Sequence, residues 1–152
     1  MNAVYTSFQV SKRWNEWKLD AEENPTPLPP SDDMLRVAVV GGGDIGVRNA
    51  NSVQAATGAS VAVVCDINPD VLRSLSKMCG APGVAEYNEL VQRPDIDAVL
   101  LSIPHHLHAP FAIRAAQAGK HVLLEKPMGV NLQAASEIVT GCQQAGIRLT
   151  VN

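Results

Sequence analysis

From residue 35 onward, short apolar runs alternate with segments whose apolar positions recur at helical spacing. The apolar runs are rich in β-branched residues and predict strands. Fully apolar strands separated by helices are typical of a parallel sheet covered on both faces. We therefore expect an α/β fold, a doubly wound parallel sheet of about six strands. The predicted strands are residues 36–40, 60–65, 84–86, 98–102, 121–124 and 147–151, and the predicted helices are residues 44–57, 69–79, 88 onward, 108–118 and 132–145.

Residues that favour helix ends lie at several of these boundaries. Asn68 precedes Pro69. An Asn side chain accepts hydrogen bonds from the first N–H groups of a helix, and Pro is favoured at the first helical position. Gly80 stands just past the predicted end of that helix, where a glycine stop is expected. Asn131 and Gly146 bracket the last helix in the same way.

Residues 1–33 differ in composition from the rest of the chain. They contain both tryptophans, Trp14 and Trp17, and a cluster of prolines at positions 25, 27, 29 and 30. Proline fixes φ and lacks a backbone N–H, so this cluster predicts an extended linker. The segment is either a partly ordered leader or an arm that docks on this subunit or a neighbour. We divide the chain into an N-terminal extension with a Pro-rich linker, residues 1–33, and one domain, residues 34–152.

Composition and charge exclude several classes of protein. The formal net charge is −3 and no cluster of Lys and Arg is present, so we expect no nucleic-acid partner. No apolar run approaches the roughly 20 residues that span a bilayer, and the N-terminus lacks the apolar core of a secretory signal. The three cysteines, at positions 65, 79 and 142, are odd in number and far apart. They predict reduced thiols in a cytoplasmic protein.

A glycine-rich turn follows the first predicted strand. Gly41, Gly43 and Gly46 fit the pattern G-x-G-x-x-G, with Asp44 and Ile45 between the last two glycines. The first glycine permits a tight turn, the second lets the backbone approach a pyrophosphate, and the third lets helix and strand pack closely. The N-terminus of the next helix offers N–H groups and a partial positive charge to phosphates.

An acidic residue follows the second predicted strand. Asp66 lies 20 residues after Gly46, where a carboxylate would accept hydrogen bonds from the adenosine ribose of NAD. The 2′-phosphate of NADP would meet the same carboxylate, and the next residue, Ile67, offers no positive charge. We therefore expect NAD, with NADP less favoured. A methyltransferase can also carry glycines and an acidic residue here, so this region alone does not establish redox chemistry.

Two later segments carry a family resemblance. The sequences SIPHHLH at 102–108 and AGKHVLLEKP at 118–127 resemble the N-terminal Rossmann domain of the glucose–fructose oxidoreductase, inositol dehydrogenase and MocA family, and the likeness runs from Leu35 to the last residue. The resemblance implies a C-terminal α/β domain, absent here, that supplies the substrate pocket and much of an oligomer interface. We therefore interpret the chain as the cofactor-binding part of a longer homo-oligomeric enzyme, inactive by itself.

The resemblance also assigns roles to residues after the fifth predicted strand. Lys126 is the expected catalytic residue, which contacts the substrate beside the nicotinamide and stabilises negative charge on its oxygen. Glu125 is expected to contact or position the cofactor. The Lys126–Pro127 bond is expected to be cis. His121, at the start of the strand, is expected to be structural.

The loop after the fourth predicted strand is expected to pass close to the nicotinamide. Ser102, Ile103 and Pro104 are its candidate cofactor contacts. Ile103 departs from the family, which often has Thr or Asn there, and it cannot donate a hydrogen bond. His108 is either a further cofactor contact or a structural residue at a helix start. A metal site built from the nearby histidines is not expected, because no carboxylate or thiol lies near them in sequence.

Three functions remain open at this point. The leading interpretation is a nicotinamide-dependent oxidoreductase acting on a sugar, a polyol or a related hydroxy compound. The second is a glycosidase or lyase of the same family that uses the nicotinamide transiently. The third is a non-catalytic nucleotide-binding or redox-sensing module. The sequence identifies neither the substrate nor the direction of the reaction.

Overall fold

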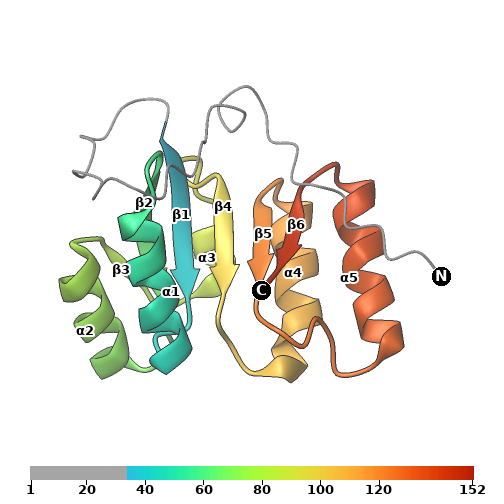
Figure 1. The fold of residues 1–152 in the computed structure, drawn as a ribbon, viewed down its shortest axis with the longest axis horizontal. Helices are drawn as coiled ribbons and strands as arrows, with labels where there is room; N and C mark the ends of the chain where they lie inside the picture. Colours follow the sequence, from blue (N-terminus) through green and yellow to red (C-terminus); the bar gives the residue numbers. More distant parts are fainter. Residues whose placement is uncertain (1–33) are drawn as a thin grey trace, which may run out of the picture.

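The computed structural model describes residues 34–152, and the predictions made for residues 1–33 lie outside that range. Within the described range, parallel strands form one six-stranded sheet in the order β3-β2-β1-β4-β5-β6 (Figure 1). The order reverses between β1 and β4, as in doubly wound folds, and the predicted fold class is confirmed. The strands are β1 (Leu35–Val40), β2 (Ala59–Cys65), β3 (Gly83–Val84), β4 (Ala98–Leu101), β5 (His121–Leu124) and β6 (Leu149–Val151).

Helices connect successive strands and begin and end near the predicted positions. Gly80 and Gly146 end their helices with φ of 64° and 67°, the left-handed region that glycine adopts without strain. The first helix ends two residues earlier than predicted, because Ala56 is extended with ψ of 132°. The helices are α1 (Asp44–Ala55), α2 (Pro69–Cys79), α3 (Tyr87–Val91), α4 (His108–Gln117) and α5 (Leu132–Gln144), with a 3₁₀ turn, η1 (His105–Leu107), before α4.

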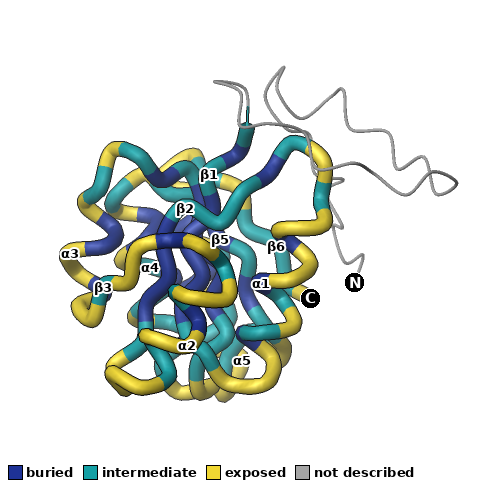
Figure 2. The backbone as a smooth tube through the Cα atoms, turned by 90° about the vertical axis from the view of Figure 1, so that its left-hand side faces the viewer, coloured by how far each residue is buried: buried dark blue, intermediate teal, exposed yellow. Residues whose placement is uncertain are grey.

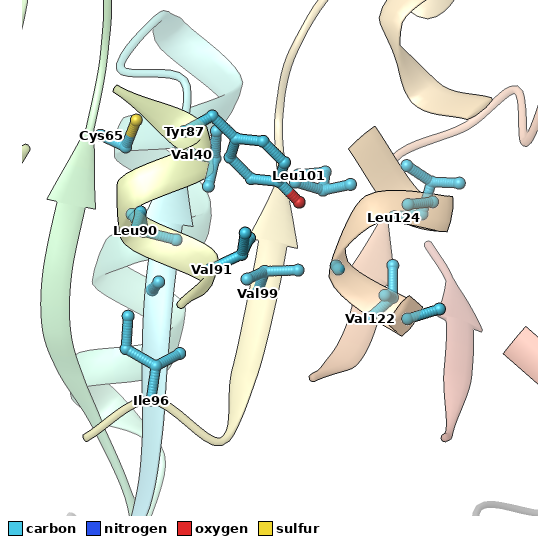
Figure 3. Packing of buried hydrophobic residues seen from close by; sticks show 14 of the residues in the cluster. Val40, Cys65, Tyr87, Leu90, Val91, Ile96, Val99, Leu101, Val122 and Leu124 are labelled. Atoms are coloured by element: carbon cyan, nitrogen blue, oxygen red, sulfur yellow. The ribbon is translucent and has the colours of Figure 1, made fainter. Parts of the chain in front are cut away.

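Alternate residues of each strand face opposite layers of helices. Ala38 and Val40 of β1 belong to a cluster with side chains of α3, α4 and α5. Val37 and Val39 of the same strand belong to clusters with side chains of α1 and α2. Figure 3 shows part of the first cluster, and Figure 2 shows the buried strands enclosed by more exposed helices. The central strands are thus buried on both faces, which is why most of their residues are apolar.

All six strands point the same way, so their carboxyl ends meet at one edge of the sheet (Figure 1). This carboxyl edge is where open parallel sheets bind ligands. The residues that follow β1, β2, β4, β5 and β6 along the chain are Gly41, Asp66, Ser102, Glu125 and Asn152.

Candidate functional site

A pocket of about 790 Å³ opens at the carboxyl edge, over β1, β2 and β4. It lies across the point where the strand order reverses. Seven of the residues that the sequence placed in a cofactor site line it: Gly41, Gly43, Asp66, Ile67, Ser102, Ile103 and Pro104.

Two glycines of the turn are required by close backbone contacts. Gly41 has φ of 92°, and a Cβ there would lie 2.2 Å from the carbonyl oxygen of Ser102. A Cβ on Gly46 would lie 1.8 Å from the carbonyl oxygen of Gly41. Real Cβ atoms do not approach so closely, so both positions exclude larger residues. The turn therefore packs against the ends of β1 and β4 in the way that the spacing of the glycines predicts.

The middle glycine of the pattern, Gly43, stands at the start of α1 and faces open space. A Cβ on Gly43 would have no atom within 4 Å. Gly43 is the N-cap of α1, and no side chain of the described residues caps the helix there. The first turn of any α-helix leaves N–H groups without intrahelical partners, and the helix dipole adds partial positive charge. The start of α1 is thus built to hold an anion such as a pyrophosphate.

Asp66 is held beside this turn by backbone groups. Its Oδ2 accepts a hydrogen bond of 2.7 Å from the N–H of Gly42, and its Oδ1 accepts one of 2.8 Å from the N–H of Asn68. Each carboxylate oxygen has a second lone pair, so both can still accept a hydrogen bond from a ribose hydroxyl. The carboxylate therefore fixes the glycine turn while facing the pocket.

The pocket is also lined by residues of α3 and α4 that the sequence did not predict as part of the site. Tyr87 and Phe111 stack with ring centroids 4.2 Å apart, and the Tyr87 hydroxyl donates to the carbonyl oxygen of Phe111. Arg114 of α4 also lines the pocket. These residues come from α3 and α4, which carry no nucleotide-binding motif, so only the fold brings them to the cofactor side.

Cys65 lines the same pocket but is poorly suited to chemistry. Burial, and to a smaller extent the nearby charge of Asp66, raises the pKa of the thiol to about 12. A nucleophilic cysteine needs the opposite shift, towards the thiolate. Cys65 is a packing residue at the end of β2.

Six other residues on the predicted site list do not line the pocket. Asp44, Ile45 and Gly46 form the first turn of α1, and Ile45 is 46% exposed. Glu125 and Lys126 follow β5, and Lys126 is exposed. The Lys126–Pro127 bond is cis, as expected. The sixth, His108, is enclosed in the fold.

Hydrogen bonds join the end of β5 to its neighbours through a residue of α1. The Nδ2 of Asn49 donates to the Oγ of Ser102 and to the Oε1 of Glu125, both at 2.9 Å. The Nδ2 of Asn152 donates to the same Oε1 at 3.1 Å. These bonds, first that of Asn49 and then that of Asn152, lower the pKa of Glu125 below its ordinary value, and Lys126 adds to the effect. Glu125 is therefore a carboxylate held in place by amides.

His108 begins α4, as expected, but its ring is fully buried. Its Nδ1 lies 2.9 Å from the carbonyl oxygen of Pro127 and its Nε2 lies 3.0 Å from that of Ile103. Both nitrogens thus face main-chain carbonyl oxygens, to which a ring N–H can donate, and His108 does not line the pocket. His108 instead joins the loop after β4 to the turn after β5. His121 also has a structural contact, since its Nδ1 accepts from the N–H of Arg148.

Among residues 34–152, no group of three or more His, Cys, Asp or Glu side chains is arranged to hold a metal ion. No helix there combines the length and the apolar character needed to cross a membrane. The cysteines at 65, 79 and 142 are free thiols.

Comparison with known proteins agrees with this geometry. Residues 35–152 match the profile of a family described as oxidoreductases with an NAD-binding Rossmann fold. The myo-inositol 2-dehydrogenase of Thermotoga maritima is 29% identical over 116 residues, which are 76% of this chain and 35% of that protein. The chain spans about a third of the length of the curated relatives it matches, at 36% and 30% for two uncharacterised oxidoreductases.

Two solved structures are also similar. A 3-ketoreductase from Actinomadura kijaniata, in complex with NADP and TDP-benzene, has a TM-score of 0.74 and 32% identity over 78% of this chain and 37% of that chain. The WlbA dehydrogenase from Bordetella pertussis, in complex with NADH and UDP-GlcNAcA, has a TM-score of 0.75 and 31% identity over 82% of this chain and 36% of that chain.

Proposed function

Because this chain belongs to the oxidoreductase family with an NAD-binding Rossmann fold, we propose that residues 34–152 bind NAD(H) as the cofactor domain of an enzyme that oxidises or reduces a sugar, polyol or related hydroxy compound. The observation that carries the proposal is the start of α1, uncapped by any described side chain, beside the carboxylate of Asp66. An anion site next to a ribose site is what a dinucleotide requires.

The residues of the site divide between the two halves of the cofactor. The first turn of α1, from Gly43 onward, would hold the pyrophosphate. Asp66 would accept from the adenosine ribose hydroxyls, and the pocket beside Phe111 would hold the adenine. The other half of the dinucleotide would then extend past Ser102 towards the end of β5. When bound, the nicotinamide supplies the site that gives or takes a hydride.

Lys126 is the residue we propose for contact with the substrate. It is exposed at the end of β5, so its ammonium is accessible to a hydroxyl or carbonyl group held there. Its role would be to donate a hydrogen bond to that oxygen and to stabilise negative charge developing on it. Glu125, held by amides, would face the cofactor and leave contact with the substrate oxygen to Lys126.

The substrate class is proposed from the relatives. Three of the relatives described above are an inositol dehydrogenase, a 3-ketoreductase and a dehydrogenase bound to a sugar nucleotide. They favour a net redox reaction over hydrolysis or elimination assisted by NAD, and over a non-catalytic module. We propose that the whole enzyme is a cytoplasmic homo-oligomer and that residues 1–33 form its N-terminal extension.

The test is a calorimetric titration of the chain with NADH, NADPH and S-adenosylmethionine. We expect saturable NADH binding, lost or much weakened in Asp66→Ala. Asp95→Ala is the matched control, since it removes a carboxylate at the opposite edge of the sheet, where Asp95 pairs with Arg93. Binding of S-adenosylmethionine in place of NADH would contradict the proposal.

A second assay asks whether the 152 residues suffice for catalysis. A rate enhancement depends on holding the substrate against the cofactor, and the described residues supply the cofactor's side of that contact. We expect NADH binding without oxidation of a panel of polyols by NAD. Turnover that is lost in Lys126→Ala would show that this chain forms a complete active site.

A further inference from the structure

A helical residue just outside the G-x-G-x-x-G pattern contacts two strand ends at the carboxyl edge. Asn49 is on α1, three residues after Gly46, and is partly buried. Its side-chain amide has two hydrogens. One is donated to Ser102 at the end of β4 and the other to Glu125 at the end of β5, at 53 and 76 positions further along the chain. The helix that begins at the glycine turn is thereby tied to two neighbouring strand ends.

We infer that Asn49 is a positioning residue for the nicotinamide half of the cofactor. It acts through Glu125, whose carboxylate it holds at the edge over which that half would extend. The inference rests on the proposed NAD(H) site and adds to it a residue that no cofactor-binding motif indicates.

The geometry of the amide supports a specific role over general packing. An aliphatic side chain of the same size could fill the space but would leave Glu125 with one side-chain amide donor, Asn152. A hydrogen bond to a charged group contributes more than one between neutral groups. The Oγ of Ser102, which accepts the other hydrogen, can still donate its own hydrogen to a ligand.

Comparing NADH with a ligand that has only its adenosine and pyrophosphate part separates this positioning role from a structural one. ADP carries the adenosine and the pyrophosphate but neither the nicotinamide nor its ribose. Removing the Asn49 amide should therefore weaken the binding of NADH and leave the binding of ADP nearly unchanged. A residue that only stabilises α1 would change both affinities together, since both ligands use the glycine turn.

The experiment compares wild type, Asn49→Leu and Asn49→Asp in the whole 152-residue chain. Leu matches the size of Asn without donors, and Asp matches its shape but faces Glu125 with a second negative charge. We expect the Kd for NADH to rise about tenfold in Asn49→Leu, the loss of one hydrogen bond to a charged group, and to rise further in Asn49→Asp. The Kd for ADP should change by about twofold or less. The fluorescence of bound NADH should also shift towards that of the free nucleotide.

Glu125→Gln should likewise weaken NADH and spare the ligand without the nicotinamide half. This second variant tests the role of Glu125 in the inference if the Asn49 variants do not fold. Equal loss of both ligands, or no loss of either, overturns the inference while leaving the NAD(H) site intact. A wild-type chain that binds neither ligand overturns the proposed function and this inference with it.

Discussion

The helices α1 and α2 follow neighbouring strands of one sheet, and their first turns are built in opposite ways. At α2 the side chain of Asn68 accepts hydrogen bonds from the N–H groups of Asp70 and Val71. At α1 the corresponding residue is Gly43, and within residues 34–152 no side chain caps that turn. The protein satisfies one helix start by itself and leaves the other for an anion.

The glycines of the open turn provide the test with the largest expected effect. In Gly46→Ala the new Cβ would meet the carbonyl oxygen of Gly41 at 1.8 Å. We expect the free energy of unfolding to fall by at least about 3 kcal/mol, because backbone on both sides of the contact has to move. Thermal unfolding measures the loss.

Gly141→Ala is the matched control for that substitution. Gly141 lies inside α5, and a Cβ there would be 3.4 Å from the nearest side-chain atom, which belongs to Ile113 of α4. We expect unchanged or slightly higher stability, since Ala is the better helix former. If both substitutions proved equally mild, the turn would not require glycine at position 46.

The carboxylate beside the open helix should select between the two dinucleotides. We expect NADH to bind more tightly than NADPH by about tenfold to a thousandfold, because the 2′-phosphate would lie near Asp66 and solvent screening removes only part of the repulsion. Ile67, the next residue, is 91% exposed and carries no compensating charge. Calorimetric titration of both nucleotides decides it, and tighter NADPH binding would show that Asp66 does not face the ribose.

Capping α1 artificially should close its anion site. In Gly43→Asp the side chain can accept from the first-turn N–H groups, as Asn68 does at α2. We expect NADH affinity to fall by about tenfold to a hundredfold, while stability rises by a few tenths of a kcal/mol. Calorimetry and thermal unfolding measure the two quantities on one sample. Unchanged affinity would mean that the pyrophosphate binds elsewhere.

Removing the side-chain cap of a helix that does not face the pocket should have the smallest effect. It should lower stability and leave NADH affinity unchanged, the opposite of what is expected for Gly43→Asp. At α5, Asn131 accepts from the N–H of Ala134 at 2.8 Å. We expect Asn131→Ala to cost about 1 kcal/mol of unfolding free energy and to leave the Kd for NADH unchanged. Asn131→Gly should cost less. A large loss of affinity would assign α5 a role in the cofactor site.

The sequence predicted most of the residues that make the start of α1 differ from the starts of α2 and α5. Asn68 and Asn131 were predicted as caps, and Gly41, Gly43 and Asp66 as parts of a nucleotide site, because each acts on backbone within a few residues or at a fixed spacing. The predicted last strand begins at Leu149 in the structure, since the N–H of the preceding Ile147 bonds back to Cys142. The pattern of apolar residues does not show that the N–H of Ile147 is used by the end of α5 and not by the sheet.

What the sequence could not predict depends on contacts between distant elements. Asn49 reads as an ordinary helical residue, because its partners follow β4 and β5. Phe111 and Arg114 reach the pocket only when α4 packs on the sheet. His108 was predicted correctly as a helix start, but the position of its ring between two main-chain carbonyl oxygens, one of them of Pro127, follows only from the fold.

The two backbone hydrogen bonds to Asp66 have a consequence for engineering cofactor preference. An obvious design for NADP would replace this aspartate by a neutral residue. Asn has a single acceptor oxygen and Ala has none, so at least one of the N–H groups of Gly42 and Asn68 would lose its partner. The redesign would thus loosen the loop that any dinucleotide needs. Ile67, which projects into solvent at the pocket rim, is the position where a positive charge can be introduced without disturbing the scaffold.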